Sequence, residues 1–114
     1  MNDFDIPIFK KTYDLYKTLY TWRNAIPKQD RYGVWQRCED LALNVLEGLQ
    51  RASQLPKTEK IPVLEKASFE LDMLRVFIRL AKDIKAIDNK KYIALEGVID
   101  DIGRQLGGWI RASH

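Results

Sequence analysis

The sequence predicts an all-α protein, a single antiparallel four-helix bundle with up-down-up-down connections. Three observations predict it: apolar residues recur at intervals of three and four in four successive segments, no segment alternates with period two, and the breaks between segments are short. Such intervals place the apolar residues of each segment along one stripe, and short connections force neighbouring helices to run antiparallel. We expect one domain over residues 1–114, because the chain is too short for two ordinary domains.

We expect the helices at approximately residues 6–26, 30–53, 58–86 and 89–112. Each carries a stripe that should face the bundle core. In chain order, the stripe residues are Ile8, Thr12, Leu15, Leu19, Trp22 and Ile26, then Trp35, Cys38, Ala42, Val45, Leu49 and Ala52, then Leu64, Ala67, Leu71, Leu74, Ile78 and Ala81, and finally Tyr92, Leu95, Ile99, Ile102, Leu106 and Trp109.

The breaks between these segments contain residues that end or begin helices. Pro27 cannot continue a helix interior, because it lacks an N–H group and clashes with the preceding turn. Asp30 is then suited to cap the second helix, and Asp88 the fourth. Thr58, followed by Pro62, suits the start of the third helix.

Composition excludes several classes of protein. No run without a charged residue exceeds six residues, which is far too short to span a membrane. The N-terminus has acidic residues before its first lysine and no apolar core, so it is not a secretory signal. The single cysteine, Cys38, excludes an internal disulfide and favours a cytoplasmic location. The net charge of +3 permits an acidic partner, such as a nucleic acid, without requiring one.

Residues for catalysis or metal binding are almost absent. The one histidine is the terminal residue, His114, and neither a phosphate-binding glycine loop nor a Glu-x-x-His pattern occurs. Cys38 lies on a core stripe, where a thiol is inert. The carboxylate pairs Glu39-Asp40 and Asp100-Asp101 point to different helix faces and are expected in solvent. We therefore expect no enzyme, no cofactor and no metal site.

The first and third helices are apolar on more than one face. On the third helix a second apolar group lies well away from the core stripe, and the first helix carries an aromatic stripe about 100° from its own. Such extra faces usually cover another helix or subunit, so they predict a homo-oligomer; a broad core within one chain is the alternative. The candidate interface residues are Phe9, Tyr13, Tyr16 and Tyr20 on the first helix and Phe69, Met73, Phe77, Leu80 and Ile84 on the third, with Val76 in the same apolar group.

Glycines inside the fourth helix need a compensating role, because each costs about 1 kcal/mol relative to alanine. Gly103 and Gly107 are four residues apart, so they form a flat strip that lets another backbone or a large aromatic ring approach closely. Alternatively, Gly107 and Gly108 only fray the end of the helix.

One edge of the third helix is basic, because Arg75, Arg79 and Lys82 fall within a narrow sector. This spacing lets side chains meet successive phosphates. The full set of candidate nucleic-acid or partner-binding residues is Arg75, Arg79, Lys82 and Lys85, with Lys10, Lys11 and Lys17 from the first helix. The alternative is local pairing at helical spacing, with Asp72 next to Arg75, Asp83 next to Arg79, and Asp14 next to Lys10 and Lys17.

Three stretches together carry a family resemblance: AIPKQDRYGVWQR (25–37), LRVFIRLAKDI (74–84) and IGRQLGGWIRAS (102–113). The chain resembles the four-helix-bundle family of the accessory variability determinant (Avd) of diversity-generating retroelements and of proteins encoded in rRNA intervening sequences. The family's turn motif corresponds to Pro27-Lys28 and Arg31-Tyr32, its Arg-Leu-Ala run to residues 79–81, and its Gly-Gly-Trp to residues 107–109.

The resemblance implies a barrel-shaped homopentamer with a basic surface, which associates with a reverse transcriptase and its template RNA. DNA is a further candidate ligand of the basic surface. Catalysis would belong to the reverse transcriptase. A net charge of +3 is low for a subunit that holds RNA tightly. The alternative implied function is therefore that of an rRNA intervening-sequence protein, a structural or protein-interaction oligomer without direct nucleic-acid contact.

Overall fold

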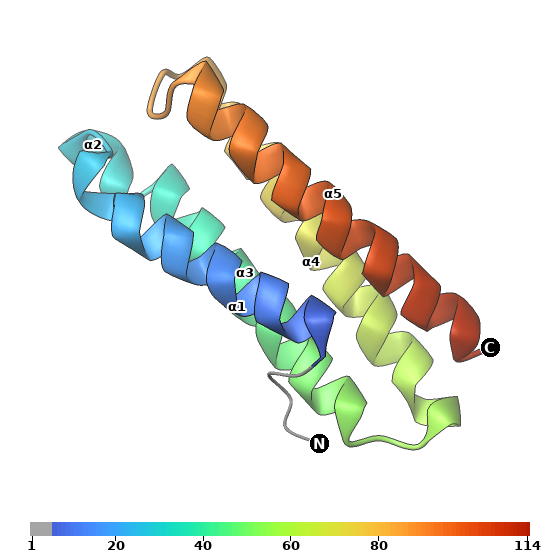
Figure 1. Cartoon of the computed structure of the whole chain (residues 1–114). Helices are drawn as coiled ribbons and strands as arrows, with labels where there is room; N and C mark the ends of the chain where they lie inside the picture. Colours follow the sequence, from blue (N-terminus) through green and yellow to red (C-terminus); the bar gives the residue numbers. More distant parts are fainter. Residues whose placement is uncertain (1–5) are drawn as a thin grey trace.

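The computed structural model describes residues 6–114, and within them it is an all-α bundle without strands (Figure 1). The long helices run antiparallel, and the molecule measures 43 × 24 × 22 Å. Within residues 6–114, no helix combines the length and the hydrophobicity that a membrane span requires. The elements are α1 (Pro7–Trp22), the 3₁₀ turn η2 (Arg23–Ala25), the short α2 (Lys28–Arg31), α3 (Val34–Ser53), α4 (Lys57–Asp83) and α5 (Asn89–Ala112).

The four long helices surround one core. α3 packs against α1 and α4, and α5 packs against α4 and α1, so α1 and α4 lie at diagonal corners of the bundle. The predicted four-helix bundle with short connections is confirmed. The chain ends of the described part lie at one end of the bundle, and α2 and the α4–α5 turn lie at the other (Figure 1).

The core is formed by the four predicted stripes. Every stripe residue is buried except Trp22 and Trp109, which are half-buried. The structure adds Leu41 to the core, together with Ala86 and Ile87 from the α4–α5 turn. Intervals of three and four therefore identified nearly the whole interior, because these intervals keep side chains on one face of a helix.

The connection between the first two long helices differs from the prediction. α1 ends at Trp22 rather than at residue 26, and Ile26 is extended, since a residue that precedes a proline avoids the helical region. The next long helix begins at Val34 rather than at residue 30, with Gly33 as its N-cap residue. Asp30 lies inside α2 and caps nothing, so its predicted role is wrong.

The ends of α4 and α5 are closer to expectation. α4 begins at Lys57 with Pro56 at the N-cap position, so Thr58 lies inside the first turn, and Pro62 lies further along the helix. α4 ends at Asp83, not 86, because Lys85 adopts a left-handed conformation with φ 65°. The N-cap prediction for the last helix is confirmed, since the backbone N–H of Lys91 donates to Asp88 Oδ1 at 2.8 Å.

Lys85 gives a testable backbone effect. A side chain in the left-handed region costs about 1 kcal/mol, a cost that glycine avoids. We expect Lys85→Gly to raise the free energy of unfolding by up to about 1 kcal/mol in urea denaturation. Lys90→Gly, in the first turn of α5, is the control and should lower it by up to about 1 kcal/mol. A loss of stability in Lys85→Gly would contradict the left-handed conformation of Lys85.

Glu39 corrects the prediction that its carboxylate lies in solvent. The residue is 1% exposed, and both carboxylate oxygens accept hydrogen bonds from Arg23, one from Nε at 2.9 Å and one from Nη2 at 2.7 Å. This bidentate pair raises the pKa of Arg23, chiefly through the hydrogen bond to Glu39. The pair ties η2, immediately after α1, to α3. The neighbouring Cys38 is buried, and burial raises the pKa of its thiol to about 12.

Candidate partner-binding surfaces

The predicted basic edge of α4 lies along the boundary with α5. Arg75 forms an ion pair with Asp100 of α5 rather than with Asp72. Arg79 Nε lies 3.2 Å from Asp83 Oδ1, as the alternative of local pairing predicted. The ammonium of Lys82 lies 4.6 Å from the centre of the Tyr92 ring. Each of the three cations therefore already contacts a group of its own chain.

Neighbouring groups of the same chain partly neutralise the positive charge of this edge. Hydrogen bonding with Asp83, and secondarily with Tyr92, raises the pKa of Arg79. The Tyr92 hydroxyl donates to Glu96 Oε1 at 2.8 Å, and this bond raises the pKa of Tyr92. Exposed ion pairs contribute only about 0–1 kcal/mol, so a polyanion that makes several contacts can displace them. The edge is available to a partner, but it is not a patch of free charge.

The lysines of α1 do not join that edge. Lys10 pairs with Asp14 at 2.9 Å, as expected, whereas Lys17 lies 5.5 Å from the ring of Tyr13. Lys11 reaches across to α5 and pairs with Asp101 at 2.6 Å, an interaction that lowers the pKa of Asp101. Because α1 and α4 lie at diagonal corners, α5 stands between the two sets of cations. The structure thus separates the predicted binding residues into two surfaces.

Lys85 belongs to neither surface. It is exposed in the α4–α5 turn, at the same end of the bundle as α2 (Figure 1). The sequence placed it with Arg79 and Lys82 by assuming that the helix continues to residue 86. The left-handed turn at Lys85 instead ends the helix and separates this lysine from the edge.

The second apolar face of α4 remains largely exposed. Phe69 is 63% exposed and Val76 is 57% exposed, with Leu80 and Ile84 also exposed. Met73 and Phe77 are half-buried against the core, and the Arg37 guanidinium covers Phe77 at 5.5 Å from the ring centre. On α1, Tyr13 and Tyr20 are exposed whereas Phe9 and Tyr16 are half-buried. A broad core within one chain therefore does not account for the α4 face.

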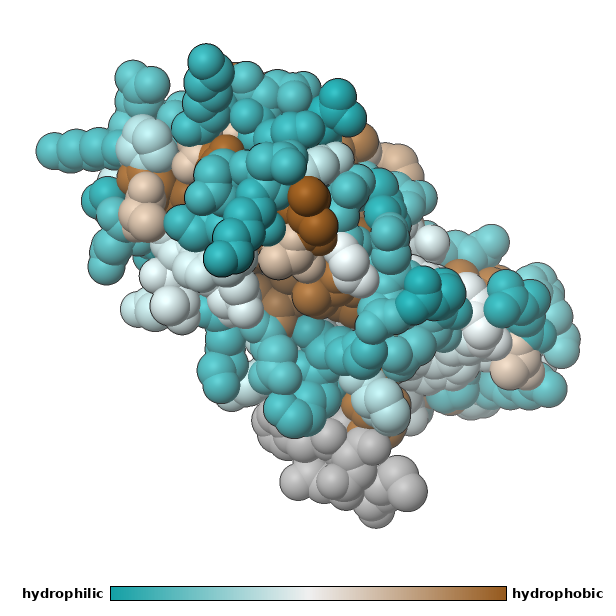
Figure 2. Space-filling model, turned by 45° about the horizontal axis from the view of Figure 1, so that its top comes forward, coloured by the Kyte–Doolittle hydropathy of each residue, from teal (hydrophilic) through white to brown (hydrophobic). Residues whose placement is uncertain are grey.

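A second apolar surface lies between α1 and α5. A groove of about 360 Å³ runs between these helices, with Leu15, Trp22 and Val98 among its lining residues and the Lys11–Asp101 pair at its side. Val98, which lines the groove, is exposed, and so is Ile93 elsewhere on α5. Figure 2 shows apolar side chains, in brown, in the middle of a mostly hydrophilic face. The sequence did not predict this surface, because it depends on how α1 and α5 pack.

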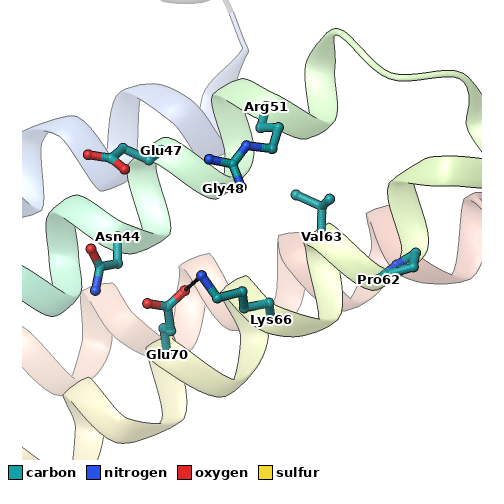
Figure 3. A pocket seen from close by; sticks show the side chains of 8 residues that line it. All are labelled: Asn44, Glu47, Gly48, Arg51, Pro62, Val63, Lys66 and Glu70. Carbon is teal, nitrogen blue, oxygen red and sulfur yellow. Dashed lines mark ion pairs between the residues drawn. The ribbon is translucent and has the colours of Figure 1, made fainter.

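A groove between α3 and α4 is lined by both charged and apolar residues (Figure 3). Its volume is about 280 Å³, and each helix contributes one carboxylate and one cation to its lining, with Lys66 Nζ 3.9 Å from Glu70 Oε1. Gly48 lies at its base, where an added Cβ would be only 3.2 Å from that of Ala67, so glycine lets α3 and α4 approach closely. Residues 6–114 contain no cluster of three histidine, cysteine or acidic side chains that could hold a metal ion.

The helical glycines of α5 behave differently from one another. An added Cβ at Gly103 would meet Arg75 and Leu71 of α4 at 3.7 Å each, so this glycine faces the neighbouring helix of its own chain. Gly107 and Gly108 face only the side chain of Arg111 from their own helix. Of the predicted flat strip, α4 therefore packs against Gly103 but not against Gly107. The helix continues through Gly107 and Gly108 to Ala112, so these glycines do not fray its end.

The fold and its surfaces define a small four-helix-bundle protein with an apolar helix face that its own core leaves open. Residues 7–113 match the family model described as bAvd-like. The chain therefore belongs to the bAvd-like family, as the three sequence stretches predicted. A comparison with curated proteins found no significant match.

Proposed function

We propose that this protein is a non-enzymatic accessory factor of a diversity-generating retroelement. It assembles into a homo-oligomeric barrel, pentameric by family resemblance, and binds reverse transcriptase and template RNA through basic surfaces. The observation that carries the proposal is family membership over residues 7–113, which is nearly the whole chain. The exposed apolar face of α4 supports the oligomer, because a contiguous exposed patch of this kind marks an interaction surface.

Purification with candidate partners tests the function. The tagged protein is coexpressed with the reverse transcriptase and the template RNA of a diversity-generating retroelement. We expect all three to purify together. Light scattering of the protein alone should return five chains of 13.3 kDa each. A monomer at micromolar concentration, or a protein that retains neither partner, would refute the proposal.

A pair of double variants tests whether the exposed apolar face of α4 is the oligomer interface. Phe69→Asp with Leu80→Asp places two charges at exposed apolar positions, so it should convert the oligomer to a folded monomer of unchanged helicity. Asn24→Asp with Gln54→Asp makes the same change in net charge at exposed polar positions and should leave the stoichiometry unchanged. If both double variants keep the wild-type mass, α4 is not the interface.

A structural oligomer of the rRNA intervening-sequence kind is the second candidate. The observation that favours it is the pairing of Arg75 and Arg79 with acidic residues of their own chain. An intact oligomer that binds neither the reverse transcriptase nor RNA would assign this function instead.

A further inference from the structure

The net positive charge of the described residues is enriched at one end of the bundle. Residues 22–40 and 82–91 together contain eight basic and five acidic side chains, a net charge of +3, and the rest of residues 6–114 contains eleven basic and nine acidic side chains, a net charge of +2. The two segments are together 29 residues long, so more than half of the net positive charge of residues 6–114 comes from about a quarter of them. One segment carries η2 and α2, and the other carries the α4–α5 turn.

The two segments share a surface. Figure 1 places α2 and the α4–α5 turn at the same end of the molecule. Contact between the segments is direct, because the ammonium of Lys91 lies 5.5 Å from the centre of the Trp22 ring. We call this surface the basic end.

Three cations at the basic end are free to bind a ligand. Lys28, Lys85 and Lys90 are exposed and form no ion pair within residues 6–114. Each lies in or next to a turn, and the left-handed turn fixes the backbone of Lys85. In contrast, Arg75 and Arg79 on the predicted α4 edge are engaged in ion pairs.

An aromatic ring is held in the open at the same end. Tyr32 is 70% exposed, in the turn that follows α2. Its turn is braced from within: Arg31 Nη2 donates to the carbonyls of Asn24 at 3.3 Å and Ile26 at 3.2 Å, and Ile26 itself is buried. The Arg23–Glu39 pair anchors the start of the same connection. The ring is therefore presented on a rigid support, which reduces the entropy lost when it binds a partner.

We propose that the basic end binds single-stranded polynucleotide, with a base stacked on Tyr32 and phosphates contacted by Lys28, Lys85 and Lys90. An exposed aromatic ring beside unpaired cations is the combination that such binding uses. A duplex keeps its base faces stacked internally, so it would use the cations but not the ring. This inference rests on the proposed function and names the form of RNA and the surface that binds it.

Three variants test the surface by fluorescence anisotropy, with an oligouridylate of about 20 nucleotides and an RNA duplex of similar length as probes. The end variant is Lys28→Gln, Lys85→Asn, Lys90→Gln, in which asparagine tolerates the left-handed backbone. The control variant is Lys57→Gln, Lys66→Gln, Arg111→Gln, which removes equal charge from exposed positions elsewhere. The third is Tyr32→Ala. Circular dichroism establishes that each variant is folded.

The end variant should bind the oligouridylate roughly 10- to 100-fold more weakly. It should also reduce the slope of log affinity against log salt by roughly 2, because each phosphate contact with a single strand contributes about 0.7. Tyr32→Ala should weaken oligouridylate binding by about 10-fold at an unchanged slope, and should leave duplex binding within about 2-fold. The control variant should change the affinity for the oligouridylate and for the duplex by no more than about 3-fold.

Equal losses in the end and control variants, or no effect of Tyr32→Ala, would overturn the basic end as the site while leaving the proposed function standing. A fourth variant, Arg79→Glu with Lys82→Glu, tests the α4 edge, and loss of oligouridylate binding in this variant alone would move the site there. Poly-glutamate that competes with the oligouridylate and still binds Tyr32→Ala with full affinity would assign the end to an acidic polypeptide. A wild-type protein that binds neither RNA probe would refute both proposals.

Discussion

Replacing Arg23 by methionine is expected to lower the free energy of unfolding by about 3 kcal/mol. The change leaves the Glu39 carboxylate buried without its cation, and breaking a buried ion pair from one side costs roughly 3–5 kcal/mol. The lower end of that range applies because Arg23 is 30% exposed, so water reaches part of the site. Small domains are stable by only about 5–15 kcal/mol, so the loss is large. Guanidinium denaturation followed by circular dichroism measures it, at one fixed protein concentration.

A second substitution separates the ion pair from simple loss of packing. Arg23→Met combined with Glu39→Met replaces both charges by apolar side chains and should recover most of the lost stability. Arg37→Met is the matched control, because Arg37 is exposed, lies over the face of Phe77 and forms no ion pair within residues 6–114, and it should cost less than about 1 kcal/mol. A double variant as unstable as Arg23→Met alone would show that the buried carboxylate is not the cause.

The interior of this protein was predictable from sequence because helical spacing alone defines a face. Glu39 shows where the prediction stopped short. It lies four residues after Trp35, so its position on the core side of α3 was visible, but its charge argued for solvent. What decides its burial is Arg23, which is 16 residues earlier and held in place by η2. A partner supplied by a turn of unpredicted geometry cannot be found from the spacing within a helix.

Some surface features were likewise predictable from the sequence, and others were not. The apolar face of α4 was predictable, because the angular positions of Phe69, Val76 and Leu80 follow from helix geometry. The pairing of Arg75 with Asp100 was not, because it depends on how α4 and α5 are aligned along their lengths. Asp72 was the nearest acid in sequence, and local spacing favoured it. The basic end was missed because its cations come from two connections that only the fold brings together (Figure 1).

Replacing Trp35 by alanine is expected to lower the free energy of unfolding by about 3–5 kcal/mol, the range for removing a large buried aromatic side chain. Trp35 is 0% exposed, and its Nε1–H donates to the carbonyl of Leu19 at 2.9 Å. That carbonyl belongs to the last turn of α1, where helical carbonyls lack partners from their own helix. The indole therefore fills the core and also completes the hydrogen bonding at the end of α1.

The two roles of Trp35 can be measured apart. Trp35→Phe keeps most of the ring but leaves the Leu19 carbonyl unpaired, so about 1–3 kcal/mol should be lost. Hydrogen exchange should then quicken in the last turn of α1 more than in α4, because only α1 loses a bond. Trp109→Phe is the control, since Trp109 is half-buried, and it should cost about 1 kcal/mol or less. Uniform exchange across both helices in Trp35→Phe would mean that the indole acts through packing alone.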